Sequence, residues 1–268
     1  MTWSTGVHVM DRSAIQRATT VLAFDDRPVA KRVGLVVLAT DHTTEPDFRR
    51  MVASDGIAVY TARIAFANPT TPDNLRRMQP RLEEGAGLIL PDELVDAVCY
   101  SCTSASVVIG DDAVETAIRS AKPGVPVVTP PLAAVRALTV LGARRISILT
   151  PYTAETSRSM ADYFADRGFG VASFTCFGLD DDRIMARINP ESLVTAAIEA
   201  TAPDAEALFI SCTALRSAGI VPAIERAIGR PVVTSNLATA WACLRLCGVD
   251  EARPALGRLM ALPAPAEV

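Results

Sequence analysis

The sequence AVCYSCTS, residues 97–104, recurs about 110 residues later as ALFISCTA, residues 207–214, with Ser-Cys-Thr kept in register. Each copy is an apolar run followed at once by small hydroxyl residues, which predicts a buried strand that ends at a turn. The first backbone amides beyond such a strand, together with a helix dipole, favour a cysteine thiolate and also bind carboxylate oxygens. We therefore predict that Cys102 and Cys212 are two reactive thiols that face each other across an active site.

Two further segments repeat at nearly the same spacing. Residues 126–129 match residues 231–234, and residues 38–41 align with residues 149–152. Three aligned segments indicate a duplicated unit of about 110 residues. Each unit is expected to supply parallel strands and covering helices, so the predicted fold class is α/β with two similar Rossmann-like lobes. The strands are expected at residues 33–38, 57–64, 95–100 and 125–128, and again at 145–149, 171–177, 207–210 and 231–234.

The same pattern sets the expected division of the chain. Helices are predicted at residues 71–84, 112–121, 130–141, 154–167 and 237–246, and a further helix begins at Asn189. The last helix is expected to cross back to the first lobe, so that residues 31–130 and 236–262 form lobe 1 and residues 131–235 form lobe 2. Residues 1–30, with a short helix at 12–19, are interpreted as an N-terminal arm that lies on a partner subunit of a homo-oligomer, a dimer or a tetramer.

The composition narrows the class of protein. Half of the 268 residues are apolar and only 5% are aromatic, which suits parallel strands that helices cover on both faces. The net charge of -4 is mild and the basic residues are scattered, so nucleic acid is not an expected partner. No apolar run reaches the ~18 to 20 residues that cross a bilayer, and residues 1–12 lack the apolar stretch of a secretory signal. We expect a cytoplasmic protein without a membrane partner, whose six cysteines are reduced thiols.

Metal and cofactor sites are not favoured by the sequence. Cys99 and Cys102 form a C-x-x-C pair to which Cys243 and Cys247 would add the other half of a zinc site. However, Cys99 lies in an apolar strand and Cys243 in an apolar helix, whereas zinc knuckles sit in polar loops. The two histidines of the chain are too few for a histidine-based triad or a multi-histidine metal centre. Because no phosphate-binding glycine motif occurs either, we predict that the protein uses neither a metal nor a cofactor.

Four of the predicted strand-end loops carry a resemblance to a known family. The loops at residues 38–45, 101–104, 150–153 and 211–215 are similar to those of the aspartate/glutamate racemase superfamily, and more closely to its branch of maleate cis-trans isomerases and arylmalonate decarboxylases. The resemblance covers residues 31–249 and implies two lobes related by a pseudo-two-fold axis, with the substrate carboxylate between the two cysteine positions. It also implies a hydrogen bond from Tyr152 to that carboxylate and an oxyanion pocket at Thr103 and Ser104. The substrate-binding residues expected from these loops are Asp41, His42, Thr103, Ser104, Tyr152, Thr153, Thr213 and Ala214.

Two positions depart from the pattern of those relatives. The decarboxylases keep only the second cysteine and have glycine at the first, so the presence of both Cys102 and Cys212 favours a racemase or an isomerase. Maleate isomerases have asparagine where this chain has Asp41, and two carboxylates about 4 Å apart repel by roughly 4 kcal/mol at an effective dielectric near 20. Asp41 therefore predicts a substrate with one carboxylate and a cationic or hydrogen-bond-donating group at its other end, unless Asp41 only caps the helix expected near Thr43. Taken together, the loops most resemble the ectoine-utilisation branch of this family.

The expected function is that of a cofactor-independent isomerase or racemase acting on a small carboxylate. In a racemase, one thiolate removes a proton next to the carboxylate while the opposing thiol delivers a proton to the other face. In a cis-trans isomerase, Cys102 adds to the substrate, a bond rotates, and Cys212 manages the proton. Two alternatives stay open: a decarboxylase, in which Cys212 alone protonates the carbanion, and a two-lobed binding module, in which both thiols are dispensable.

Overall fold

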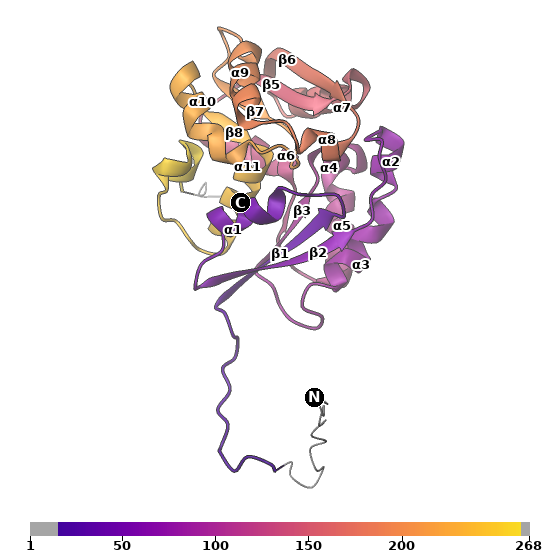
Figure 1. The fold of residues 1–268 in the computed structure, drawn as a ribbon, viewed down its shortest axis with the longest axis vertical. Coiled ribbons are helices and arrows are strands. Elements are labelled where there is room, and N and C mark those ends of the chain that lie inside the picture. The colour runs from indigo at the N-terminus through magenta and orange to yellow at the C-terminus, as the bar shows by residue number, and fades with distance from the viewer. Residues whose placement is uncertain (1–15, 264–268) are drawn as a thin grey trace, which may run out of the picture.

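Two parallel four-stranded sheets form the frame of the protein (Figure 1). The computed structural model describes residues 16–263. The first sheet has the order β2-β1-β3-β4 and the second the order β6-β5-β7-β8, so corresponding strands take the same places in both. The strands of the first sheet are β1 (Lys31–Leu38), β2 (Ile57–Ile64), β3 (Ala97–Ser101) and β4 (Val127–Val128). Those of the second are β5 (Arg145–Tyr152), β6 (Gly170–Leu179), β7 (Ala207–Ile210) and β8 (Val232–Thr234). We call each sheet with its helices a lobe; the α/β class and the two similar lobes predicted from the repeat are confirmed.

The strands form where apolar runs are buried on both faces. In β1 every residue after Lys31 is buried, and all of β3 and β7 is buried. Such continuous apolar strands are typical of parallel sheets covered on both sides by helices. The pairing of β1 with β3 brings Val37 opposite Ser101, so the first Ser-Cys-Thr motif begins level with the end of the central strand. All eight expected strands are present: two match at both ends, and no end of the others differs by more than three residues.

Eleven α-helices within residues 16–263 connect and cover the strands. Those that precede the second sheet are α1 (Thr44–Met51), α2 (Pro72–Arg76), α3 (Leu82–Gly87), α4 (Thr103–Ile109), α5 (Asp111–Ala121) and α6 (Pro130–Val140). The later ones are α7 (Ala154–Ala165), α8 (Asp182–Met185), α9 (Pro190–Ala200), α10 (Val221–Ile228) and α11 (Ser235–Leu246). None of the helices in this part of the chain has the length and apolar character that crossing a bilayer requires.

Helix α11 joins the two lobes. Ten of its twelve residues are buried, and apolar or small residues occupy all of its faces, as expected for a helix enclosed on every side. It packs against α6 and also contacts β3 of the first sheet and β8 of the second. Near its end, Trp241 donates a hydrogen bond of 3.0 Å to the carbonyl oxygen of Leu262, which ties the C-terminal segment to the helix.

Three predictions about local structure were wrong. The helix expected at residues 71–84 is divided into α2, a 3-10 turn (Gln79–Arg81) and α3. Pro80 lies in that turn and has no N–H to continue the α-helical hydrogen bonding. Strand β5 does not end at residue 149 but continues through Tyr152. Of the helix expected at residues 12–19, residues 12–15 lie outside the described part and residues 16–19 are not helical.

Residues 16–30 extend away from both sheets (Figure 1). Val21 and Phe24 in this segment are 94% and 86% exposed. At its base Arg27 pairs with Asp96, which also accepts from Lys31 at the start of β1.

Candidate active site

The two Ser-Cys-Thr motifs end corresponding strands, but their backbones differ. Cys102 follows β3 with an extended backbone (φ -150°, ψ 107°) and is the N-cap residue of α4. Cys212 follows β7 with a φ of +101°. This region is sparsely populated by residues other than glycine, and such strained conformations cluster at functional sites where the surrounding structure enforces them.

Hydrogen bonds across the lobe boundary hold the motifs in place. Thr103 Oγ1 donates to Ser235 Oγ (2.8 Å), and Ser235 Oγ also accepts from the backbone N–H of Cys212 (3.0 Å). Thr213 Oγ1 donates in the other direction, to the carbonyl oxygen of Ser101 (3.2 Å). The threonine of each motif thus bonds to the opposite side of the boundary, and Ser235, at the start of α11, connects one motif to the other.

A small cavity of about 20 Å³ lies between the two thiols. Both lobes line it, and both cysteine side chains reach it although they are only 5% and 6% exposed. The lining residues from the first lobe are Leu38, Asp41, Phe66, Thr70, Leu75, Cys102 and Ser104. Those from the second are Tyr152, Asp182, Met185, Cys212, Thr213 and Ala214.

Burial, more than hydrogen bonding, sets the protonation of the thiols. Burial raises the pKa of Cys102 to about 11, although the backbone amide of Ala105 and the hydroxyl of Ser104 favour the thiolate. Burial likewise raises the pKa of Cys212 to about 12, against a lowering by Tyr152 and the backbone amide of Ala214. The turn amides expected from the sequence are therefore present, but desolvation outweighs them. In this closed arrangement both cysteines are protonated at neutral pH.

Tyr152 is the last residue of β5 and is almost fully buried beside Cys212. Burial raises the pKa of its phenol well above the usual value, and the neighbouring Cys212 and Cys102 add to the rise. Tyr152 therefore stays a neutral phenol, which can donate a hydrogen bond to a carboxylate or to a sulfur.

Asp41 both lines the cavity and caps a helix. Its Oδ1 accepts from the backbone N–H groups of Thr43 (2.9 Å) and Thr44 (2.8 Å), and its Oδ2 accepts from Thr44 Oγ1 (2.8 Å). These bonds satisfy the start of α1, and burial raises the pKa of the carboxyl group. The two interpretations offered by the sequence, a residue of the cleft and a helix cap, are thus combined in one side chain.

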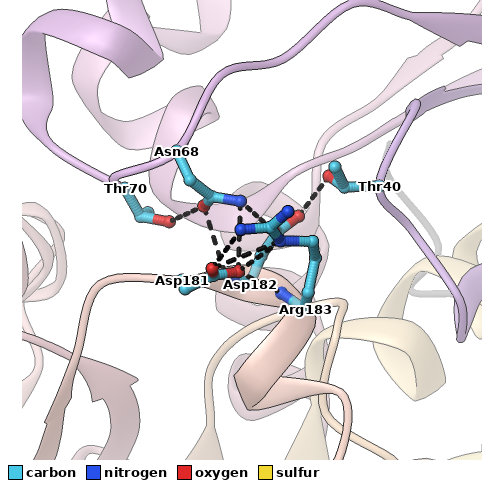
Figure 2. A network of polar contacts seen from close by, with 6 residues as sticks. All are labelled: Thr40, Asn68, Thr70, Asp181, Asp182 and Arg183. Carbon is cyan, nitrogen blue, oxygen red and sulfur yellow. Dashed lines mark hydrogen bonds and ion pairs between the residues drawn. The ribbon is translucent and has the colours of Figure 1, made fainter.

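Asp182 was missed by the sequence analysis. It begins the short helix α8 and receives Asn68 Nδ2 at 2.7 Å on Oδ1 and the hydroxyl of Thr40 on Oδ2, both from the first lobe (Figure 2). The neighbouring Asp181 accepts from Asn68 as well, at 3.1 Å. A signal was present in the sequence, because three aspartates at residues 180–182 follow the end of β6, and ligands of parallel α/β sheets bind at the carboxyl ends of strands.

Three expected site residues do not line the cavity. His42 is exposed and lies in a separate groove with Arg50 and Arg216. Thr153 caps α7, since its hydroxyl accepts from the backbone N–H of Thr156. Thr103 is buried and directed to Ser235. The structure brings together Cys102, Cys212, Asp41, Ser104, Tyr152, Thr213 and Ala214, and it adds Asp182.

No set of three histidine, cysteine or acidic side chains among residues 16–263 is placed to hold an ion. Cys99 and Cys102 belong to different core clusters, as the alternation along β3 predicts. Cys99 instead lies against the thiol of Cys243, whose pKa this contact and burial raise.

The known proteins to which this chain is similar are arylmalonate decarboxylases and maleate isomerases. A family model for arylmalonate decarboxylase matches residues 34–260. A maleate isomerase of Pseudomonas putida is 26% identical over 247 residues, which are 85% of this chain and 96% of that enzyme. The arylmalonate decarboxylase of Bordetella bronchiseptica is 33% identical over 150 residues, 55% of this chain and 62% of that enzyme. A solved maleate cis-trans isomerase of Nocardia farcinica, a cysteine-to-serine mutant with a covalently bound succinylcysteine intermediate, has a TM-score of 0.78 at 24% identity and covers 86% of this chain and 98% of its own.

Proposed function

The chain belongs to the arylmalonate decarboxylase family of enzymes, and we propose that it is a cofactor-independent isomerase or racemase that uses two cysteines on a small carboxylate. The observation that carries the proposal is that Cys102 and Cys212, from corresponding strand ends of the two lobes, line one cavity. A decarboxylase that protonates a carbanion needs one acid, whereas chemistry on both faces of a substrate carbon needs two.

Neutral hydrogen-bond donors in the cavity bind the substrate carboxylate in this proposal. Ser104 and Tyr152 line the cavity and carry hydroxyls that can donate, whereas the hydroxyl of Thr213 donates to the carbonyl oxygen of Ser101. The amides of Ala105 and Ala214 already bond to the sulfurs. Hydrogen-bond donors that are fixed before the reaction stabilise the negative charge that develops on the carboxylate as a neighbouring carbon loses its proton.

Two reaction courses fit this arrangement. In racemisation, one thiolate takes the proton of the carbon next to the carboxylate, the electron pair moves into the carboxylate, and the other thiol protonates the opposite face and becomes the thiolate. In cis-trans isomerisation, the thiolate of Cys102 adds to a carbon of the double bond, the new single bond rotates, and elimination of the thiolate restores the double bond in the other geometry. The succinylcysteine found in the Nocardia farcinica enzyme is a covalent adduct of this second kind.

Substitution of each thiol tests the proposal. Cys102→Ala and Cys212→Ala should each lower turnover by at least ~100-fold, as loss of a positioned acid or base does. Solvent deuterium uptake into candidate carboxylates and cis-trans conversion of candidate unsaturated carboxylates, both followed by NMR, provide the assay. Cys176→Ala is the matched control, because Cys176 is a half-buried cysteine outside the cavity. Near-native turnover in both site variants would exclude a two-thiol mechanism, and a loss confined to Cys212→Ala would indicate the decarboxylase alternative.

The finer aspects of the function are also proposals. The loops at residues 41–45, 102–104 and 212–216 support a role in ectoine or hydroxyectoine degradation, through their resemblance to that branch. The need for two free thiols supports a reducing compartment, and hence the cytoplasm. The exposed Val21 and Phe24 support a homo-oligomer in which residues 16–30 pack on a partner subunit.

A further inference from the structure

The cavity between the thiols contains two carboxylates and no cationic side chain. Asp41 comes from the first lobe and Asp182 from the second, and each is about 5% exposed. Lysine, arginine and histidine are all absent from the described residues that line the cavity. Buried carboxylates are costly unless they are paired with a cation, so this arrangement requires an explanation.

Hydrogen bonds account for the position of the carboxylates but not for their charge. Among the described residues, the carboxylate of Asp41 accepts hydrogen bonds only from Thr43 and Thr44. The carboxylate of Asp182 accepts hydrogen bonds only from the neutral side chains of Thr40 and Asn68. Neither carboxylate takes part in any of the ion pairs found among residues 16–263.

The nearest cations, Arg63 and Arg183, influence these carboxylates only through space, because their direct ion pairs are made with other residues. Arg63 pairs with Glu45 and donates to the backbone carbonyl of Asp41 rather than to its carboxylate. Arg183, which follows Asp182, forms its ion pair with Asp181 (Figure 2). Among the described residues no cationic side chain forms an ion pair with either carboxylate, so a cation that enters the cavity would be their first direct ionic partner.

We infer that Asp182 is a specificity residue that, together with Asp41, selects a substrate bearing an organic cation, such as an amine, amidine or guanidine, at the end opposite its carboxylate. The inference rests on the proposed function only in taking the substrate to be a small carboxylate. A cation between the two aspartates gains charge-assisted hydrogen bonds from both lobes. A second carboxylate in the same place is repelled by both, which excludes dicarboxylates by the arrangement of charge rather than by size.

The same charges affect the thiols. Asp182 contributes to the raised pKa of both cysteines, and Asp41 to that of Cys102. A cationic group that neutralises the two aspartates removes this contribution, so binding of the correct substrate makes each thiolate easier to form. A dicarboxylate has the opposite effect. Selection by charge thus acts on catalysis as well as on binding.

Two thiol reagents of similar size and opposite charge measure this selection without knowledge of the substrate. The complete chain is treated with 2-aminoethyl methanethiosulfonate, a cation, or 2-sulfonatoethyl methanethiosulfonate, an anion, and modification of each cysteine is followed by peptide mass spectrometry. The ratio of cation to anion rates at Cys102 and Cys212 should exceed the ratio at Cys176, which lies outside the cavity in the same chain, by about tenfold or more.

The variant that tests Asp182 has a matched control one residue away. Asp182→Asn should lower the rate ratio at both cavity cysteines by at least about threefold. Asp181→Asn removes the same charge from the same loop, but Asp181 does not line the cavity and pairs with Arg183. In this variant the ratio of cation to anion rates at Cys102 and Cys212 should stay within about twofold of the wild-type ratio. Asp182→Glu keeps the charge and should keep the preference.

Ligand binding provides an independent measurement. Calorimetric titration of the wild-type chain with 4-aminobutanoate, glutarate and pentanoate compares a cationic, an anionic and an uncharged group at one end of a monocarboxylate of nearly constant length. 4-Aminobutanoate should bind at least about tenfold more tightly than glutarate.

Several results would overturn the inference. They are anion rates at the cavity cysteines that equal or exceed the cation rates, glutarate binding as tight as that of 4-aminobutanoate, or an equal effect of Asp181→Asn and Asp182→Asn. Should Asp182→Asn fail to fold, the two wild-type comparisons still decide the point. None of these readouts depends on turnover, so a cation preference combined with dispensable thiols would reject the proposed reaction and keep the inference, and the converse result would do the reverse.

Discussion

The cysteine residues show that sequence reasoning can bring two side chains to one cavity and still give the wrong expectation of their protonation. The Ser-Cys-Thr repeat led to Cys102 and Cys212, and the turn amides predicted beside them are present. The sequence does not reveal how deeply the two lobes bury these sulfurs. Burial depends on contacts between residues more than 100 positions apart, such as the bond from Thr103 to Ser235, and it raises the pKa of each thiol instead of lowering it.

The raised pKa values predict the pH dependence of thiol modification. A thiol whose pKa is about 11 or 12 is almost entirely protonated at pH 7, and its thiolate fraction rises about tenfold for each pH unit until the pKa is reached. Alkylation of Cys102 and Cys212 by the uncharged reagent iodoacetamide should therefore increase about tenfold per unit from pH 7 to pH 9 without levelling off. Peptide mass spectrometry measures the rates, with free cysteine as the control, since its rate levels off above pH ~8.5. A plateau at the cavity cysteines below pH 9 would contradict the burial argument.

Residues that act through long-range contacts were the ones that sequence reasoning missed. Asp182 and Ser235 lie outside both Ser-Cys-Thr motifs, and each gains its role only when the lobes meet. Conversely, His42 follows the first strand as a binding residue would, yet the backbone turn at Asp41 directs it to the surface. Position in a strand-end loop therefore predicts which segments meet, but not which side chain of a segment faces the ligand.

At the scale of elements, strands were easier to predict than helices. Each strand of these sheets is an apolar run bounded by turn residues, and burial on both faces leaves little ambiguity. The segment at residues 71–84 satisfied a helical pattern as well, but Pro80 lies in a 3-10 turn that interrupts it, and α3 starts after that turn. The apolar pattern indicates which face of a segment is buried, but it does not show where a proline interrupts the helix.

Two glycines in α3 provide a matched test of its packing on β2. A Cβ at Gly85 would lie 2.6 Å from Cγ2 of Ile64, a β-branched and buried strand residue that cannot easily move, whereas a Cβ at Gly87 would meet only Ala121 at 3.7 Å. Gly85→Ala should therefore lower the free energy of unfolding by about 1 to 3 kcal/mol. Gly87→Ala should leave it unchanged or raise it slightly, because alanine is the better helix former. Denaturant titration of both variants gives the comparison, and equal stabilities would mean that α3 does not pack closely on β2.

At the scale of the whole molecule, the duplication was visible in the sequence but the junction between the lobes was not. The segment after β6 reaches over to the loop after β2, where Asn68 bonds to Asp181 and Asp182 (Figure 2). The N–H of Thr70 also donates to the carbonyl oxygen of Asp180 at 2.6 Å. We call these contacts the interlobe clasp. No counterpart of the clasp is implied by the repeat, because it joins one unit to the other.

Loss of the interlobe clasp should loosen the structure locally without lowering the stability of the whole fold. Asn68→Ala removes the two bonds from the side-chain amide to the carboxylates of Asp181 and Asp182, and the bond that the backbone N–H of Asp182 donates to Asn68 Oδ1. Amide hydrogen exchange at residues 66–71 and 180–185 should therefore become faster while exchange in the central strands stays the same. Asn189→Ala is the control: it removes the hydrogen bond that the backbone N–H of Ser192 donates to the side-chain oxygen of Asn189 at the start of α9, which lies outside the clasp. Uniformly faster exchange over the whole chain in Asn68→Ala would show instead that the clasp supports the entire fold.

The size of the cavity has a consequence for how a substrate enters and how a product leaves. Its volume of about 20 Å³ is enough for little more than a single water molecule, and a small carboxylate is several times larger. Entry of a substrate and release of a product therefore require the residues that enclose the cavity to move apart and close again. Where such a movement limits turnover, a more viscous medium slows the enzyme and leaves the barrier to proton transfer unchanged.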